Sequence, residues 1–460
     1  MTQKRDDLYY PPRPKPMGPL ASLVRVGLQG DGDLIGLMPA TAYQDDMGPL
    51  GYSRRSIMIV NDPALTKPIL ADANDIFPKN DLMVGALAPL VGNSMFVSSG
   101  DTWRRQRAMI DPAFSHMRLA KAFPSMDGAV DDFEVRLKEL AATSRPMSLD
   151  LAMGQLTADI ICRTVFSASL ANDTARDVFE SFAFFERSVA HVEVMRLIFG
   201  KPFDVIPQRP DVLAACRRIR QHIGDLLDRH LEDGSGFDDI AARVIDARDL
   251  ATDAKFTRDE LIDQLGVFFL AGHETTASAL TWALYIAGVR TDVAARIRAE
   301  VDAIAGNAPI SFEHVKRLTY TRNVFKETLR LYPPITFIPR VAREATMIGT
   351  KKIKRGTMVM ISPWAIHRHH KLWRDPDAFD PDRFSPAREH EIVSGSYIPF
   401  GNGPRVCVGA AFATTEATLI LARLLRRFSF EVQAPEKVRP IARLTTRPAQ
   451  EVLVRVATIP

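Results

Sequence analysis

The stretch PFGNGPRVCVG, residues 399–409, combines several glycines with one of the three cysteines in a chain of 460 residues. Gly401 and Gly403 permit tight turns, and Gly409 would let a flat ligand lie against the backbone. Cys407 directly precedes a predicted helix of about twenty residues, whose N-terminal dipole favours a thiolate over a thiol. The cysteine could therefore be a nucleophile, a redox sensor, an axial ligand to iron or a structural residue in a turn.

The composition is that of an ordinary globular protein, because 46% of the residues are hydrophobic and 25% are charged. No Gly/Ser linker and no internal repeat is visible. We therefore expect one body over residues 1–460, mainly α with a minor β region. The net charge of +4 is too small to indicate a nucleic-acid partner.

The cysteines and the N-terminal segment indicate where the protein works. Cys162, Cys216 and Cys407 are too few and too widely spaced for a disulfide framework or a zinc site, which favours a reducing, cytoplasmic compartment. Residues 1–20 are charged and proline-rich, with no apolar stretch for a signal peptide or a membrane anchor. We expect Cys162 to be inert in the core and Cys216 to lie on a surface helix.

Apolar spacing and turn residues divide the chain into helices, strands and loops. We expect a strand and a short helix within 56–70, a loop-rich stretch over 75–101, and short strands between 335 and 360 and at the end of the chain. Coil is predicted over 364–398. Helices are predicted over 103–185 with breaks near Pro112 and Pro146, over 211–232, 258–289, 291–305 and 321–332, and after Cys407.

One long apolar segment, LIDQLGVFFLAGHETTASALTWALYIAGV over residues 261–289, could be read as a membrane span. His273 and Glu274 lie in its middle, where a charge in lipid would be costly. We therefore favour a helix buried through the centre of a globular protein, which would span about 43 Å at about 1.5 Å per residue.

The spacing of Phe400, Gly401, Gly403, Arg405, Cys407 and Gly409 resembles the haem-binding loop of the cytochrome P-450 family. In that family the cysteine thiolate is the fifth ligand of the haem iron. The resemblance covers essentially the whole chain, because further motifs follow in the family's order. It implies a haem b between the central long helix and the helix after the cysteine, with Phe400, Arg405 and Gly409 contacting the cofactor and Cys407 bound to its metal.

The segment KETLRLYPP places Glu327 and Arg330 on one face of a helix that a pair of prolines ends. In isolation such a pair is most often solvated. The resemblance implies instead a buried structural pair completed by an arginine from a later loop, which DPDRF supplies as Arg383. Because an unpaired buried charge is strongly destabilising, these three residues should act as a unit.

The segment AGHETTAS places Glu274, Thr275 and Thr276 in the central helix. Threonines there could simply bond back to a carbonyl one turn earlier and bend the helix. The resemblance implies instead an oxygen-binding groove over the haem, where Ala271 and Gly272 keep the helix narrow. Glu274 would then take part in proton delivery, and Thr275 would hydrogen-bond the bound oxygen. An acid beside an alcohol suits ordered protonation.

The segment GDTWRRQRAMIDPAF places Trp103 and Arg107 on one helical face, as in an ordinary amphipathic helix. By the resemblance these two residues bind haem propionates together with Arg340 in FIPRVARE and with Arg405, because a guanidinium offers paired donors to a carboxylate. Arg343 lies close to Arg340 in the sequence and is the alternative for that role.

The resemblance also marks the segments that line the substrate pocket. Most of their side chains are apolar, which indicates an apolar substrate. Whether this is a terpene, a fatty acid, an aromatic compound or a steroid is left open. The residues at these positions are Phe96, Phe268, Ala271, Ile335, Phe337, Ile338, Leu444 and Thr445.

The implied function is that of a bacterial haem-thiolate monooxygenase, which inserts one atom of O2 into a C–H or C=C bond. The alternatives are a haem protein that only binds a ligand or senses a gas, a peroxide-driven peroxygenase, and a nitric oxide reductase. The last two commonly depart from the acid–alcohol pair that Glu274 and Thr275 supply. His367, His369 and His370 match a family stretch that binds no metal, so we assign none.

Electrons should come from a separate ferredoxin or flavodoxin with its NAD(P)H reductase, because no flavin, nicotinamide or iron–sulfur fingerprint is visible in the sequence. Such donors are acidic as a rule, which favours a basic docking surface near the thiolate. We expect a monomer without a nucleic-acid partner. The candidate docking residues are Arg104, Arg105, Arg423, Arg426 and Arg427.

Overall fold

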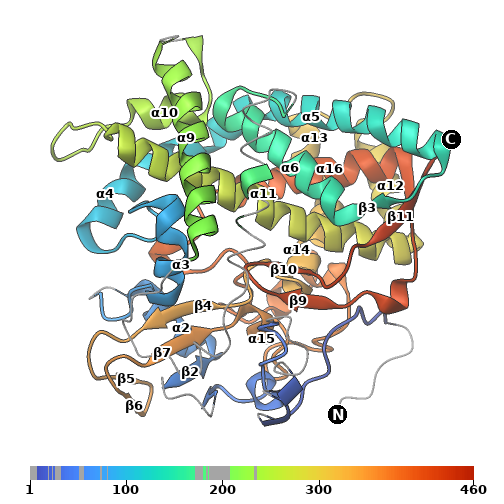
Figure 1. Ribbon diagram of the computed structural model, residues 1–460. Helices are drawn as coiled ribbons and strands as arrows, with labels where there is room; N and C mark the ends of the chain where they lie inside the picture. Colours follow the sequence, from blue (N-terminus) through green and yellow to red (C-terminus); the bar gives the residue numbers. More distant parts are fainter. Residues whose placement is uncertain are drawn as a thin grey trace.

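The computed structural model describes residues 8–18, 20–22, 24–25, 33–50, 56–72, 75–79, 81–170, 180–182, 185, 208–232 and 236–459. Within these ranges the chain is mainly helical with small sheets, as the sequence predicted (Figure 1). The helical stretch expected up to residue 185 and the proline-rich segment 1–20 lie partly outside the described residues.

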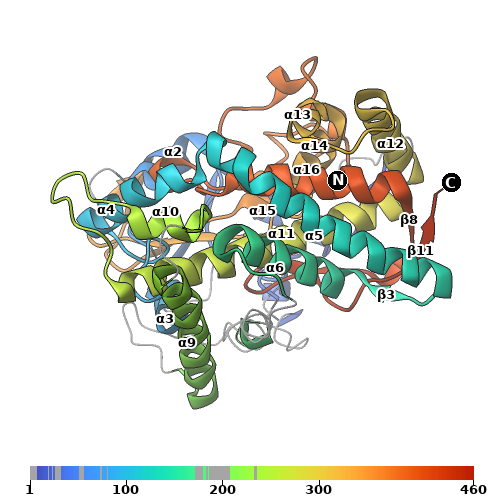
Figure 2. The same cartoon turned by 90° about the horizontal axis from the view of Figure 1, so that it is seen from above.

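The long helices α4, α5, α6, α9, α11, α12, α14 and α16 confirm the ranges expected from the apolar spacing, whereas α3, α10 and α13 were not expected and α15 lies at the start of the stretch predicted as coil. The longest of them run side by side in the helical part of the molecule (Figure 2). Their bounds are α2 Pro63–Ala71, α3 Asp81–Val91, α4 Gly100–Ile110, α5 His116–Thr143, α6 Leu149–Phe166, α9 Pro210–Glu232, α10 Ile240–Asp246, α11 Arg258–Val289, α12 Thr291–Ala305, α13 Phe312–Arg317, α14 Thr319–Leu331, α15 Pro363–Ile366 and α16 Ala410–Arg427.

The strands form small sheets, and the largest has the order β1-β2-β7-β4. In it β2 pairs with β7 in parallel, while the other neighbours are antiparallel. A second sheet has the order β3-β11-β8, and two hairpins pair β5 with β6 and β9 with β10. The bounds are β1 Met47–Pro49, β2 Ile57–Val60, β3 Met147–Ser148, β4 Ile338–Val341, β5 Thr346–Ile348, β6 Lys351–Ile353, β7 Met358–Ile361, β8 Phe428–Val432, β9 Pro440–Ala442, β10 Thr446–Pro448 and β11 Leu453–Thr458.

Helix α11 passes through the middle of the helical part (Figures 1 and 2). It begins at a capping box in which Thr257 and Glu260 satisfy each other's backbone N–H groups. Most of its 32 residues are buried. Helix α6 packs along it so closely that a Cβ at Gly272 would lie 2.4 Å from Cδ1 of Ile161. A larger residue at this contact would therefore force the side chain of Ile161 to move.

The sequence prediction of a loop over 75–101 was wrong, because α3 lies within it. The helix contains a proline, Pro89, in its last turns. Pro89 has no N–H to donate to the carbonyl of Gly85, and Nε2 of Gln208 donates to that carbonyl instead, at 3.1 Å. Helix α3 thus forms with help from a residue far away in the sequence.

Helix α11 was the segment that could have been read as a membrane span. In the ranges that the structure describes, no helix combines the length and the apolar character needed to cross a membrane. His273 and Glu274, in the middle of α11, are both buried within the protein.

Candidate active site

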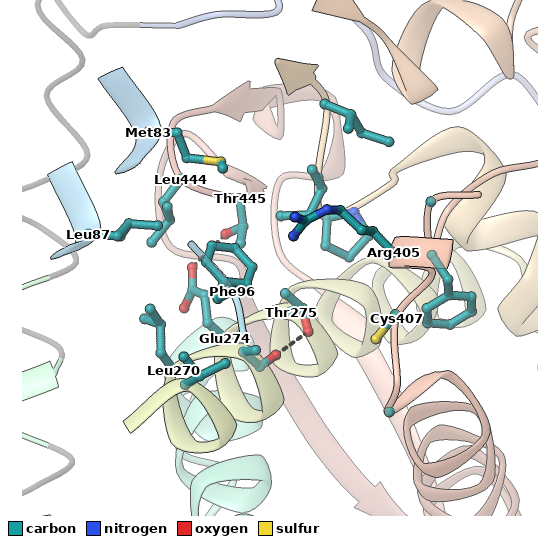
Figure 3. Close-up of a pocket in the computed structure, with 18 of the residues that line it drawn as sticks. Met83, Leu87, Phe96, Leu270, Glu274, Thr275, Arg405, Cys407, Leu444 and Thr445 are labelled. Atoms are coloured by element: carbon teal, nitrogen blue, oxygen red, sulfur yellow. Dashed lines mark hydrogen bonds between the residues drawn. The ribbon is translucent and has the colours of Figure 1, made fainter. Parts of the chain in front are cut away.

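The loop before α16 presents Cys407 to a cavity. Gly401 and Gly403 have φ values of +78° and +73°, which favour glycine. A Cβ at Gly403 would also lie 2.8 Å from the carbonyl oxygen of Leu70 in α2. The N–H of Cys407 donates to the carbonyl of Phe400 at 2.9 Å, which closes the loop. In Figure 3 the sulfur of Cys407 points toward α11 across the cavity.

The protein atoms around Cys407 do not by themselves favour the thiolate that the sequence predicted. Burial raises the pKa of the thiol above its ordinary value, although the N–H of Gly409 and the charge of Arg107 act in the opposite direction. Helix α16 begins only at Ala410, so its N-terminal N–H groups do not outweigh the desolvation. The thiolate would need a cation within the cavity to stabilise it.

The side of α11 that faces Cys407 across the cavity carries the residues predicted to form the oxygen-binding groove. Ala271, Gly272, Glu274, Thr275 and Thr276 all line the cavity. The hydroxyl of Thr275 donates to the carbonyl of Ala271 at 2.6 Å, so the back-bonded arrangement considered from the sequence is present. Thr275 is only partly buried and lies between Glu274 and Cys407 in Figure 3.

Glu274 does not contact the hydroxyl of Thr275, contrary to the simplest expectation for an acid–alcohol pair. Its Oε1 accepts hydrogen bonds from Oγ1 of Thr445 at 2.5 Å and from Nε of Arg447 at 2.6 Å. Arg447 also forms an ion pair with Oε2. The carboxylate is therefore directed toward the β9–β10 hairpin and not toward Cys407 (Figure 3).

Several cations meet at another side of the cavity. Arg405 lies 4.3 Å above the ring of Trp103, and its Nη2 donates to the carbonyl of Ser98 at 2.9 Å. Its buried Nη1 has no hydrogen-bond partner in the described part of the chain. Burial, followed by the charge of Arg405, lowers the pKa of Arg340 to about 10. Desolvated and mutually repelling cations of this kind suit a ligand with carboxylates.

Lys79 belongs to this group of cations and was missed from the sequence. It lines the cavity, forms a β-bridge with Arg340 and donates to the carbonyl of Phe96. Burial lowers the pKa of Lys79 well below its ordinary value, and Arg340 and Arg405 lower it further. No local motif surrounds this lysine, so only the pairing with a strand far along the chain could have revealed it.

Arg107 lies beside the cysteine loop, as the resemblance implied, but its guanidinium already contacts other protein groups. Nη1 donates to the carbonyl of Val406 at 2.7 Å, and Nε pairs with Asp111 at 2.5 Å. Both Arg107 and Trp103 line the cavity. Arg343, the alternative to Arg340, is absent from the lining and lies beyond the end of β4.

The cavity has a volume of about 690 Å³, and every predicted pocket residue lines it. Phe114 packs edge-on against Phe268 with ring centroids 5.2 Å apart. Met83 and Leu87 of α3 add an apolar wall that the sequence missed because this segment was expected to be a loop. In Figure 3 this wall lies on the side of the cavity away from Cys407.

The predicted structural residues meet in the interior. Arg330 donates from Nε and Nη2 to the two carboxylate oxygens of Glu327, both at 2.7 Å. Nε of Arg383 lies 3.4 Å from Oε1 of the same carboxylate. Glu327 and Arg330 are fully buried. His367 connects to them, because its Nδ1 lies 3.1 Å from the carbonyl of Arg330.

The sequence also made predictions about a histidine and two cysteines outside the cavity. Burial lowers the pKa of His367 to about 3, so this histidine is a neutral core residue. Cys216 is buried on α9 and not at a surface, contrary to the sequence prediction. Desolvation raises the pKa of Cys216 to about 11 despite Arg220 and Arg217, and burial also raises that of Cys162. Both thiols are poorly reactive.

The predicted docking surface is partly wrong. Arg423 is only 7% exposed and bonds Asp127, Asp131 and Glu134 of α5, because the acidic face of α5 packs against α16. The other candidates also have acidic partners: Arg105 pairs with Glu260, Arg426 with Asp302, Arg427 with Glu134 and Arg104 with Asp101. Arg104 and Arg427 retain side-chain exposures of 55% and 50%.

Comparison with known proteins agrees with this geometry. Residues 43–455 match the sequence model of the family described as Cytochrome P450. The chain is 32% identical over 404 residues to cyclooctatin synthase of Streptomyces melanosporofaciens, covering 86% of this chain and 85% of that protein. It is 29% identical over 415 residues to cyclooctat-9-en-7-ol 5-monooxygenase of the same organism, covering 89% and 84%.

The fold is also that of known structures. The crystal structure of the cytochrome P450DA haem domain matches with a TM-score of 0.79 at 24% identity, covering 90% of this chain and 89% of that one. The chain therefore belongs to the cytochrome P-450 family. It is a P-450 monooxygenase, and the cofactor of the family is haem b.

The residues present fit haem. Cys407 faces the cavity with its sulfur, and Gly409 leaves the backbone beside it uncovered, since even an added Cβ there would meet only that sulfur, at 3.9 Å. The unpartnered Nη1 of Arg405 offers a donor to a propionate, as does the cation of Lys79. The sequence predicted the cofactor between α11 and α16, and the cavity lies there.

Proposed function

We propose that this protein hydroxylates or epoxidises a bulky apolar substrate of the terpene type, using O2 and electrons from a separate donor protein. The observation that carries this proposal is the cavity, because most of the side chains that line it are apolar. Ligand pockets of this kind recognise shape through apolar contact. The two Streptomyces relatives, one named as acting on a cyclic alkenol, support a substrate of similar chemistry.

In this proposal Cys407 would bind the haem iron, and a set of cations and an aromatic ring would hold the propionates. Phe400, Gly409 and Ala271 contact the ring of the cofactor. Bound haem supplies the oxygen chemistry, while the protein binds, orients and protonates. The propionate residues are Trp103, Arg107, Arg340 and Arg405, to which the cavity adds Lys79.

Thr275 and Glu274 manage protons in this proposal. The Thr275 hydroxyl can donate to a ligand between α11 and Cys407 after giving up its bond to the Ala271 carbonyl. Glu274 is the nearest acid along the helix, and it must turn from Arg447 to reach the Thr275 side of the cavity. The apolar side chains of Phe96, Phe268 and Leu444 also line the cavity. In this proposal they exclude water from the space between Thr275 and Glu274.

A ligand panel tests the substrate. Purified haem-loaded protein is titrated with cyclic terpene alcohols, fatty acids, small aromatics and steroids, and the shift of the Soret band is recorded. We expect the terpene alcohols to give saturable low- to high-spin shifts at the lowest concentrations. A panel in which only fatty acids shift the band would overturn the substrate class and leave the monooxygenase assignment intact.

Reconstitution tests the donor and the reaction type. Ferredoxin, its reductase and NADH together should support product formation that peroxide alone does not. Turnover with peroxide alone would instead support the peroxygenase alternative, and ligand binding without turnover would support a sensor. The three free cysteines, far apart in the sequence, support a reducing cytoplasmic site of action.

The exposed arginines Arg104 and Arg427 are the remaining candidates for docking an acidic donor. Reversing both to Glu should slow ferredoxin-driven reduction and flatten its dependence on salt, while reduction by dithionite stays unchanged. Arg290→Glu, in the ion pair with Asp292 that precedes α12, serves as a control for loss of an equivalent surface charge. Equal slowing by the control would exclude a specific docking role.

A further inference from the structure

The carboxylate of Glu274 is held by two residues of the C-terminal hairpin. Arg447 approaches both oxygens with Nε and Nη2, and the hydroxyl of Thr445 donates to Oε1. Two hydrogen bonds to one oxygen and a guanidinium beside the other hold the carboxylate at the hairpin. The Thr275 hydroxyl is meanwhile bonded to the Ala271 carbonyl. The acid and the alcohol are adjacent in sequence, but each has a different partner.

Arg447 is itself anchored to the helix that carries Glu274. The carbonyl of the preceding residue, Thr446, accepts hydrogen bonds from Oγ of Ser278 at 2.6 Å and from Nε1 of Trp282 at 3.0 Å. The N–H of Thr446 donates to Pro334 at 2.9 Å. These buried bonds fix the backbone of β10 one and two turns along α11 from Glu274. The backbone at Arg447 is therefore fixed beside α11 by the fold, and its side chain extends from there to Glu274.

The ion pair connects the cavity with the solvent. The side chain of Arg447 is 43% exposed, whereas that of Glu274 is 4% exposed and lines the cavity. A guanidinium does not give up a proton at ordinary pH, so Arg447 cannot pass protons to Glu274. Glu274 can take a proton from water at the hairpin side and release it at the Thr275 side only after the ion pair has opened.

We propose that Arg447 is a positioning residue that holds Glu274 at the hairpin side of the cavity, and that opening of this ion pair limits proton supply during turnover. This inference rests on the proposed role of Glu274 in proton delivery. A carboxylate that must break its ion pair before each proton transfer slows the reaction. The opening of the ion pair then determines when the proton is transferred. Arg447 therefore acts on the chemistry only through Glu274.

Epistasis tests this statement. NADH oxidation is measured at saturating substrate, ferredoxin and reductase in haem-loaded wild type, Arg447→Leu, Glu274→Gln and the double variant. Arg447→Leu should be about threefold faster than wild type, the size expected for the loss of one partly exposed ion pair. Glu274→Gln should be slower, and the double variant should match Glu274→Gln. Arg447→Lys, which keeps the charge but loses the paired donors, should lie between wild type and Arg447→Leu.

A slower or unchanged Arg447→Leu would overturn the proposal, as would an equal effect of Arg447→Leu with and without Glu274. Arg455→Leu, an exposed arginine on β11, controls for the loss of a surface charge.

A second readout does not depend on enzymatic activity. Urea unfolding of the same four proteins gives a double-mutant cycle, and we expect the two changes to be non-additive. Additive changes would mean that the ion pair does not exist in solution. Absence of any O2-dependent turnover in wild type would refute the proposed function, and the unfolding cycle would then still decide whether Arg447 holds Glu274.

Discussion

The carbonyl of Val406 accepts a hydrogen bond from Nη1 of Arg107 at 2.7 Å, although 299 residues separate them. Arg107 is held in place by Asp111 one turn further along the chain. The residue next to the candidate iron ligand is thus tied to α4 by a contact that does not involve the thiol. The shape of the cysteine loop therefore does not depend on the sulfur, which makes Cys407 a suitable target for substitution.

Cys407→Ser should lose the absorption band of the reduced, carbon monoxide-bound protein that gives the family its name, because that band requires a thiolate opposite the bound gas. Circular dichroism should be unchanged, since the loop is held by backbone contacts. Cys162→Ser and Cys216→Ser serve as controls and should keep the band, because both thiols are buried away from the cavity lining. An unchanged band in Cys407→Ser would refute its role as ligand.

Thr275→Ala should keep the substrate-induced Soret shift but divert electrons from NADH into peroxide, because the hydroxyl that can donate to bound oxygen is lost. The measurement is the ratio of product to NADH consumed. Thr276→Ala is the matched control, since Thr276 also lines the cavity and differs in position by one residue. A larger loss of coupling in Thr276→Ala would transfer the role to that residue.

Gly272→Ala should destabilise the protein by about 1–3 kcal/mol, the usual cost of overpacking a core. The added methyl group would lie 2.4 Å from Cδ1 of Ile161. Gly154→Ala in α6 meets no atom within 4 Å and should stabilise by up to about 1 kcal/mol through helix propensity. Urea unfolding measures both. Ile161→Val, which removes Cδ1, should restore part of the stability of Gly272→Ala, and failure to do so would refute the packing explanation.

Glu327→Gln should lower the free energy of unfolding by about 3–5 kcal/mol, because it leaves Arg330 as a buried charge without its carboxylate. Arg296 and Asp382 form an exposed pair with the same paired geometry, at 2.8 Å for both contacts. Arg296→Leu should cost no more than about 1 kcal/mol. Equal costs for the two variants in urea unfolding would show that burial of the Glu327 pair contributes nothing.

His230 should make stability depend on pH. Burial lowers the pKa of His230, but its hydrogen bond to Asp239 and the charge of that residue outweigh burial, so the pKa is raised overall. A raised pKa stabilises the fold fully below the unfolded value of about 6.5 and loses this contribution as the pH rises through the folded value. His230→Gln should therefore cost more stability at about pH 5.5 than at about pH 8.5.

Urea unfolding of wild type and His230→Gln at both pH values gives this difference directly. His390→Gln, on an exposed 3₁₀ turn, is the control for replacing a histidine at the surface. A larger penalty for His230→Gln at the higher pH would contradict the sign.

Local spacing in the sequence was sufficient for much of the fold and site. Cys407, Thr275 and the Glu327–Arg330 pair lie in short motifs, where residues one turn apart or within one loop must lie close together. The long helices were predictable for the same reason, because each is amphipathic or apolar over many turns. The helix α3 was not, because it contains a proline, and the carbonyl that this proline leaves without a donor is bonded by the distant side chain of Gln208.

Contacts between distant residues explain the other failures. Arg423 looked like a surface cation at the end of α16, but three carboxylates of α5 cover it. Lys79 pairs with the strand that carries Arg340. Glu274 accepts a hydrogen bond from Arg447 in a hairpin that lies 173 residues further along the chain. None of these pairs has a fixed spacing, so only the folded chain could reveal which cation meets which carboxylate.

The bond between Gln208 and the carbonyl of Gly85 has a mechanical consequence. Pro89 leaves that carbonyl without a donor from its own helix, so water can replace Gln208 there without unwinding any turn of α3. Met83 and Leu87 on one side and Gln208 and Val212 on the other are walls of the same cavity. The bond from Nη1 of Arg220 in α9 to the carbonyl of Leu90 in α3, at 3.0 Å, also joins these walls. Parting them would therefore exchange side-chain hydrogen bonds and leave the backbone hydrogen bonds of α3 and α9 intact.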